Sequence, residues 1–214
     1  MCYSSKLSLM SFIFGIITSF ALIIYGNQEN INTNKAIGYY LLFVSFMQFI
    51  DYLAWIDIKC ISGLNQIAAY LGAFINNIQP IVMFILVSYY LKSKNIIPYK
   101  LLLIANISYL IYFIYKYYIY ISNNNLCLQP NADGHLVWNW RYNFYYNFYF
   151  ALIFINIINY YNNINLIISL GFSFFLLFIS KNKFNKNVGE LWCLMVTGIP
   201  LIPLFMQKVL NING

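Results

Sequence analysis

The sequence predicts an all-α protein, a single integral membrane bundle of seven transmembrane helices. Of its 214 residues, 62% are hydrophobic and 8% are charged, whereas a soluble domain carries about one-quarter charged residues. The apolar stretches also have the length of about 20 residues that a helix needs to cross a bilayer. Segments such as LLFVSFMQFIDYLAW are apolar all round, which disfavours the alternating strands of a closed barrel.

The predicted crossings use nearly the whole chain, so residues 1–214 form one domain, with no segment left for a second domain of about 50 residues or more. The first crossing follows Lys6 as a signal peptide would, but no small-x-small cleavage site follows it, so we expect it to be retained. The predicted crossings are Leu7 to Tyr25, Ala36 to Trp55, Gln66 to Leu91, Ile97 to Tyr118, Phe144 to Tyr161, Ile164 to Ser180 and Val188 to Leu210.

Polar or aromatic residues separate the crossings. The tyrosine-rich YKYYIY and NFYYNFYF lie at the end of the fourth and the start of the fifth, where aromatic rings anchor helices at the interface. Pro200 and Pro203 predict a kink in the seventh. The separators are, in order, Glu29 with Lys35, Asp57 to Cys60, Lys92 to Lys100, Ile121 to Arg141, Asn162 with Asn163, and Lys181 to Lys186.

An odd number of crossings brings most of the chemically reactive residues to one face, which we call face A. It is the face of the amino terminus and of the connections after the second, fourth and sixth crossings. Lys and Arg are divided almost evenly between the faces and leave the orientation open. The residues predicted at or near face A are Cys2, Asp51, Trp55, Asp57, Cys60, Cys127, Asp133, His135, Trp138, Trp140, Glu190, Trp192 and Cys193.

The four cysteines, Cys2, Cys60, Cys127 and Cys193, leave three chemistries open. Disulfides would place face A outside or in a lumen, because they persist in oxidising compartments, and four cysteines allow three pairings. Inert thiols are the second alternative. Thiolate or redox chemistry with His135 is the third, since zinc prefers such ligands, but the chain has no CxxC and we predict no metal site.

Ligand-binding candidates lie inside the crossings. Gln48, Asp51 and Trp55 share a helical face, and an ionisable group within a crossing usually faces the bundle interior or water. Asp51 therefore either belongs to a pocket or reaches the interface. With it we group the mid-membrane amides Asn76, Asn77 and Gln79 beside Pro80, then Thr197 before Pro200, and Glu190 with Trp192 at the face A end of the seventh crossing.

These groups outline a track with acids at the mouth and amides at the centre, which suits a cation or small polar molecule. The other interpretation of the amides is hydrogen bonding that fixes the bundle. Lys208 lies too near the opposite face for a retinal lysine, and snorkelling explains it. Soluble catalytic motifs are missing from the sequence, and no basic run indicates nucleic acid.

Short motifs along most of the chain carry a resemblance. They are Met1, Cys2, Tyr3 and Ser4, then QFIDYLAW, Cys60, Asn65, Gln66, Gln79, Pro80, Gly134, His135, Trp138, Glu190, Trp192 and Cys193. In these the chain resembles an uncharacterised family of small polytopic membrane proteins, found in bacteria and large DNA viruses, that begin Met-Cys-aromatic-Ser. The resemblance implies a membrane bundle and no known activity. A viral origin agrees with the AT-rich residue bias, as a hypothesis.

We therefore predict a multi-pass integral membrane protein that binds or conducts a small polar solute or ion through a cavity open to face A, as a channel or transporter would. Its partners would be the lipid bilayer, that solute and, since no GxxxG motif settles the matter, a second copy in a homo-oligomer. Two alternatives stay open: a membrane enzyme using thiol or carboxylate chemistry, and a structural or receptor-like protein that displays Trp138 and Trp140 outward. The sequence indicates no particular cofactor.

Overall fold

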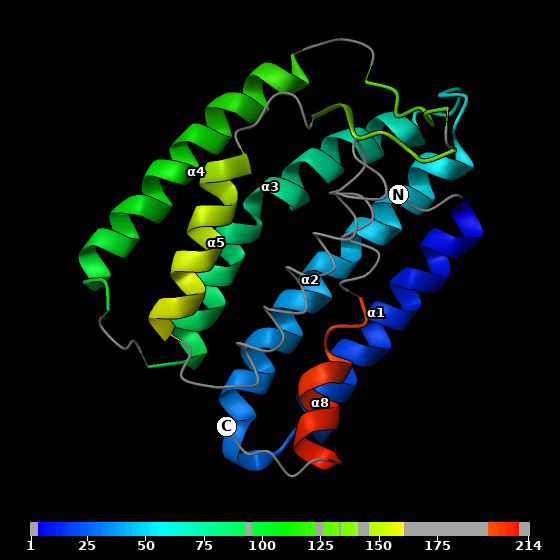
Figure 1. Cartoon of the computed structure of the whole chain (residues 1–214). Coiled ribbons are helices and arrows are strands. Elements are labelled where there is room, and N and C mark those ends of the chain that lie inside the picture. The colour runs from blue at the N-terminus through cyan, green and yellow to red at the C-terminus, as the bar shows by residue number, and fades with distance from the viewer. Residues whose placement is uncertain are drawn as a thin grey trace.

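The computed structural model describes residues 4–92, 96–122, 126–132, 134–140, 146–160 and 197–209. Within these ranges every regular element is a helix, apart from an isolated bridge between Pro130 and Leu136. This confirms the all-α class for the described part of the chain. Figure 1 shows α1 to α5 as a bundle of long helices running alternately up and down, with α8 beside α1.

Four of the helices are long and apolar enough to cross a membrane. They are α1 (Ser5–Tyr25), α2 (Ile31–Ile56), α3 (Leu64–Tyr90) and α4 (Tyr99–Ile121). The 3-10 helix η1 (Gln28–Asn30) leads directly into α2. All four lie within a few residues of the first four predicted crossings, because continuous apolar runs bounded by polar turns are a strong signal for such helices.

Two further helices are shorter. Helix α5 (Tyr146–Tyr160) has 15 residues and corresponds to the fifth predicted crossing, whereas the predicted sixth, Ile164 to Ser180, lies outside the described residues. Helix α8 (Leu201–Lys208) is the described helical part of the seventh.

Thr197 to Pro200 form a turn directly before α8. Leu201 and Ile202 donate to carbonyls three residues earlier, so the helix starts here. Pro203 is tolerated because it falls in the first turn, where backbone N–H groups have no acceptor within the helix. The predicted kink also involves the residues before Thr197, which lie outside the described part of the chain, so it stays a prediction.

Small residues bring α1 close to α2. The buried face of α1 is Ser8, Ser11, Gly15, Thr18, Ser19 and Leu22, and a Cβ on Gly15 would collide with the Ser45 side chain of α2. This is how apolar helices pack when lipid offers no hydrophobic driving force between them. At the far end, the side-chain amides of Asn34 and Gln207 bond reciprocally at 3.1 and 2.9 Å, which attaches α8 to α2.

Amide and hydroxyl groups join α3, α4 and α5. The side chains of Asn106 in α4 and Asn156 in α5 bond reciprocally at 3.1 and 3.2 Å, and Asn156 also donates to the Pro80 carbonyl at 3.1 Å. The Tyr109 hydroxyl donates to the Asn77 carbonyl at 2.7 Å. Pro80 removes a backbone donor from α3, and the neighbouring helices supply donors to carbonyls in the same stretch.

The Asn106 and Asn156 pair predicts a measurable coupling. Asn106→Ala and Asn156→Ala, alone and together, should give a double-mutant coupling of about 0.6 kcal/mol and at most about 1.7 kcal/mol, the range found for hydrogen bonds between helices in membranes. Unfolding in mixed detergent micelles measures it. Strictly additive losses would contradict the reciprocal bond.

Candidate functional site

The connection between α2 and α3 folds around the carboxylate of Asp57. Its Oδ1 accepts from the backbone N–H of Ile61 at 2.9 Å and of Ser62 at 3.1 Å, and its Oδ2 accepts from Asn65 at 3.2 Å. The Ser62 N–H is the largest influence on the pKa of Asp57; desolvation opposes it, and the N–H groups of Asn65 and Ile61 add to it. The pKa falls from 3.8 to about 2.

Asn65, at the start of α3, joins this connection to the segment after α4. Its Oδ1 accepts from the Leu128 N–H at 2.6 Å, and its Nδ2 donates to the Leu128 carbonyl and the Ala54 carbonyl, both at 3.0 Å. Asn65 is fully buried. One amide therefore completes the backbone hydrogen bonding of Leu128 and connects the end of α2 to the same point.

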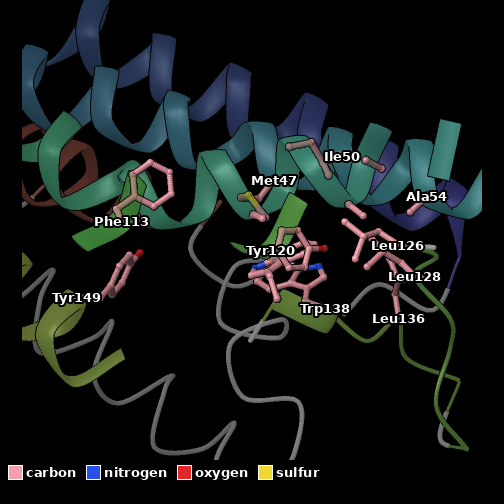
Figure 2. Packing of buried hydrophobic residues seen from close by; sticks show 14 of the residues in the cluster. Met47, Ile50, Ala54, Phe113, Tyr120, Leu126, Leu128, Leu136, Trp138 and Tyr149 are labelled. Atoms are coloured by element: carbon pink, nitrogen blue, oxygen red, sulfur yellow. The ribbon is translucent and has the colours of Figure 1, made fainter. Parts of the chain in front are cut away.

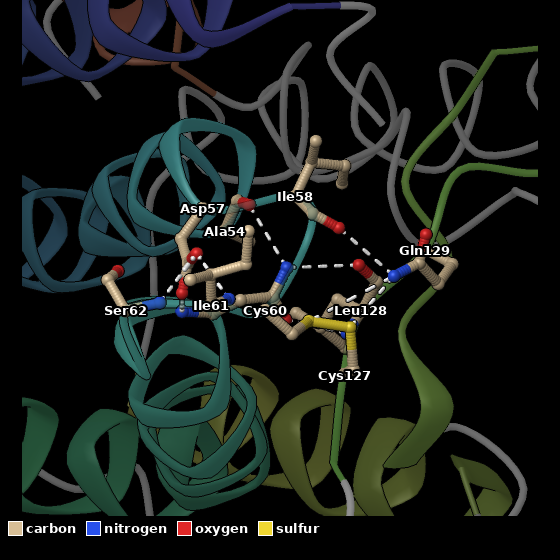
Figure 3. Close-up of a disulfide and its surroundings, with 10 residues drawn as sticks. Ala54, Asp57, Ile58, Cys60, Ile61, Ser62, Cys127, Leu128 and Gln129 are labelled. Atoms are coloured by element: carbon tan, nitrogen blue, oxygen red, sulfur yellow. Dashed lines mark hydrogen bonds between the residues drawn. A yellow bond between two sulfur atoms is a disulfide. The ribbon is translucent and has the colours of Figure 1, made fainter.

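A disulfide between Cys60 and Cys127 lies beside this junction, as Figure 3 shows. Gln129 adds a bond from its Nε2 to the Ile58 carbonyl at 3.0 Å and contacts the Cys127 sulfur at 2.8 Å. Because both sulfurs are in a disulfide, neither is a thiolate that could ligate a metal. In the described ranges no three His, Cys, Asp or Glu side chains come together as a metal site would need.

Residues 126–132 and 134–140, which we call the covering segment, form a small hairpin at this end of the bundle. Val137 donates to the Gln129 carbonyl at 3.0 Å, and Asn131 donates to the His135 carbonyl at 2.7 Å. His135 is buried, and its backbone N–H donates to the Asn131 side-chain oxygen. The inner side of the segment is apolar: Leu126, Leu128, Leu136, Trp138 and Trp140 all pack into one core cluster with α2, α3 and α4 (Figure 2).

Trp138 and Trp140 are inserted into the bundle and are not displayed on its surface. Their exposed fractions are 3% and 0%, and their rings stack with centroids 5.1 Å apart. The space comes from α3, where a Cβ on Gly72 would collide with the Trp140 ring. The expectation of two outward tryptophans, which belonged to the receptor alternative, is therefore wrong.

Asp51 lies under the covering segment. Its side chain has an exposed fraction of 0%, and its Oδ1 accepts from the Trp138 indole N–H at 3.0 Å. Gln48, nearly one turn earlier on α2, is also fully buried. Of the two possibilities for Asp51, the structure places it in the bundle interior and not at an exposed interface.

The predicted amides of α3 are buried among helices. Asn77 donates to the Ala73 carbonyl at 2.8 Å, and the Gln79 Oε1 accepts from the Tyr149 hydroxyl of α5. Asn76 is buried nearby on the same helix. These contacts favour the bundle-fixing interpretation for part of each amide, but the Asn77 Oδ1 and the Gln79 Nε2 have no hydrogen-bond partner among the residues that the structure describes.

The other predicted site residues are less closely grouped. The backbone carbonyl of Thr197 accepts from the Thr18 hydroxyl of α1 at 2.7 Å, which places Thr197 against α1. Cys2, Glu190, Trp192 and Cys193 lie outside the described residues. The predicted grouping of Glu190 and Trp192 with Asp51 therefore stays a prediction.

Several residues that build the site were not singled out for it. Asn65 appeared only as part of a resemblance, Gly72 carries no chemistry of its own, and Tyr149 belongs to a run interpreted as an interfacial anchor. One available signal is spacing, because Tyr149, Asn156 and Tyr160 are seven and four residues apart and so share a face of α5. That face makes the bonds to Gln79, Pro80 and Ser88.

Comparisons with known proteins add no relative. No family model matches the chain, and neither the curated proteins nor the solved structures contain a significant match.

The Gly72 contact predicts an overpacking effect. Gly72→Ala should destabilise the protein by about 1–3 kcal/mol, because the added methyl group displaces a buried indole. Thermal unfolding in detergent measures the loss. Trp140→Phe, which shortens the ring, should recover part of it in the double variant, and equal losses with either aromatic residue would contradict the contact.

The Asp57 site predicts a pH-dependent contribution to stability. Its pKa is lowered in the folded state, so the contribution is complete above the unfolded value of about 3.9 and is lost as the pH falls towards about 2. Asp57→Asn should therefore lower the Tm at pH 7 and lose this difference from wild type between about pH 4 and pH 2. Glu29→Gln removes an exposed carboxylate as the matched control. A difference of constant size down to pH 2 would contradict the assignment.

Proposed function

We propose that the chain is a multi-pass integral membrane protein with seven transmembrane helices that binds or conducts a small polar solute or ion. In this proposal the solute reaches Asp51 from the end of the bundle where the covering segment lies, the end that also holds the start of α1 in Figure 1. The observation that carries the proposal is a fully buried carboxylate inside a helix long and apolar enough to cross a membrane.

The outward surface of the helices supports the membrane setting. Large apolar side chains such as Ile17 in α1, Ile85 in α3 and Ile104 in α4 are exposed by more than half. Exposed tyrosines occur near helix ends, for example Tyr25 and Tyr118. Apolar flanks with aromatic rings near both ends are what a bilayer selects. The count of seven adds to these four helices α5 and two apolar stretches of the sequence, Ile164 to Ser180 and Val188 to Leu210.

The cost of burying Asp51 supports a role for it. A carboxylate buried inside a membrane bundle is expensive to retain, so such residues usually face a polar path or site. Beneath it, the Trp140 indole N–H and the Gln79 Nε2 have no acceptor among the described residues. Each unmatched buried donor costs about 1–3 kcal/mol, and a solute oxygen would relieve that cost.

The disulfide supports an orientation. Disulfides form and persist in oxidising environments, so the end of the bundle with Cys60 and Cys127 would face the outside of a cell or virion, or a lumen. The solute would enter from that side. Sequence charge alone did not separate the two orientations.

Flux through reconstituted protein tests the proposal. Wild type in liposomes should raise the permeability to at least one of K⁺, Na⁺, H⁺, urea or glycerol, followed with entrapped dyes and by stopped-flow light scattering. Asp51→Asn keeps the oxygen that accepts from Trp138 and removes the charge. Losing a charged contact of about 1.5–3 kcal/mol should lower that flux roughly ten-fold or more.

Two controls make the result specific. Glu29→Gln neutralises an exposed carboxylate at the other end of the bundle and should leave flux within about two-fold of wild type, and circular dichroism should show that both variants remain helical. If wild type moves none of the probes either before or after reduction with a dithiol, or if Asp51→Asn matches wild type, the proposed function is wrong.

A further inference from the structure

The covering segment closes the bundle over Asp51. Trp138 donates directly to the carboxylate, and Trp140 fills the space left by Gly72. Figure 2 shows the Trp138 ring at the inner side of the segment, close to Tyr120 and beneath Met47 and Ile50. A solute that approaches Asp51 from this end must displace these rings, so the position of the segment controls access.

The segment is held at the junction with the α2–α3 connection. The covalent link is the Cys60–Cys127 disulfide, and the polar links nearby are the Asn65 amide and the Gln129 side chain. Both cysteines are partly exposed, and Gln129 beside them is exposed. The disulfide therefore lies at the surface and not in the closed core, and access for a dissolved thiol is a condition for thiol–disulfide exchange.

Cys60 has a strained backbone conformation, which favours opening of the disulfide. Its φ is +56°, in the left-handed region that residues with a Cβ seldom adopt. Its N–H donates to the Asp57 carbonyl at 2.8 Å, and its sulfur is fixed by Cys127. Strain of this kind persists only where surrounding contacts hold it, and it collects at switch regions. Removing the covalent contact takes away one of the constraints.

We propose that the covering segment forms a disulfide-latched plug, and that reduction of Cys60–Cys127 by a dithiol loosens the plug and raises access to Asp51. The dithiol attacks one sulfur, the S–S bond breaks and a mixed disulfide forms. Its second thiol then displaces the protein sulfur. Two electrons and two protons pass to Cys60 and Cys127, and the dithiol becomes a disulfide. That this regulates flux rests on the proposed function, whereas the loosening itself does not.

After reduction the segment depends on contacts that open and close independently. The Asn65 bonds to Leu128 and the Trp138 bond to Asp51 remain, so the closed form persists. Without the cross-link, the covering segment can move away from the α2–α3 connection locally, and the population of its open form increases. The expected effect is a change in opening equilibrium and not unfolding of the helices.

Hydrogen exchange at the Trp138 indole measures this opening directly. The starting protein carries Cys2→Ser and Cys193→Ser, so that Cys60 and Cys127 are the remaining cysteines of the four in the chain. Its indole N–H signals are labelled with ¹⁵N, and Trp138→Phe assigns the signal. Dithiothreitol should accelerate exchange of the Trp138 indole about ten-fold. A variant that also carries Cys60→Ser and Cys127→Ser should exchange fast with or without the reductant.

Circular dichroism and liposome flux complete the test. Unchanged exchange after confirmed reduction would overturn the plug, and so would loss of helix content, since the disulfide would then only hold the fold. Faster exchange with no flux in either state would keep the plug and remove the proposed function. Faster exchange with a higher flux that Asp51→Asn abolishes would support both.

Discussion

The hydrogen bonds of the Asn65 side chain fix the covering segment against the ends of α2 and α3. A buried backbone N–H or carbonyl must find a partner, because an unmet group costs about as much as a lost hydrogen bond. Leu128 lies in an irregular segment without a strand or helix to supply partners, and Asn65 supplies both. The same amide bonds to Ala54 at the end of α2. From this point the chain continues inward and carries Trp138 and Trp140 into the core.

Two tryptophans can enter a helical bundle only where the helices carry very small side chains. Gly72 meets the Trp140 ring directly, and Ala68, Ala69 and Ala73 are fully buried in the same cluster. Close packing leaves little tolerance for extra volume. Small residues on one face of α3 and large rings on the segment are therefore complementary parts of one contact. This contact positions the segment so that the Trp138 indole reaches Asp51. The hydrogen bond to the carboxylate therefore depends on packing as well as on its charge.

The sequence predicted the helices well and their ends less well. Apolar runs about 20 residues long leave few alternatives, which is why α1 to α4 match their predicted spans. The start of α8 was not predicted, because Pro200 and Pro203 do not by themselves fix where a helix begins, and contacts such as that between Thr18 and Thr197 are not visible in the sequence.

The site was harder to predict because its members come from separate segments. The importance of Asp51 was visible from its charge, but its contact with Trp138 joins residues 87 positions apart, and no periodicity reveals such a pair. Gly72 was invisible because its contribution is an absent side chain. Asn65 gave no signal either, since its role is to bond the backbone of a segment that has no regular pattern.

The amides below Asp51 show how structural and functional roles divide within single side chains. The Gln79 Oε1 accepts a hydrogen bond from Tyr149, and the Asn77 Nδ2 donates one to the Ala73 carbonyl. Each keeps a second polar atom with no partner in the described ranges. A half-satisfied buried amide lowers the stability of the fold. If these amides only fixed helices, an apolar residue of equal size would give a more stable protein. In the proposed function, the remaining atoms belong to the same polar path as Asp51, and the bonded atoms hold them in place.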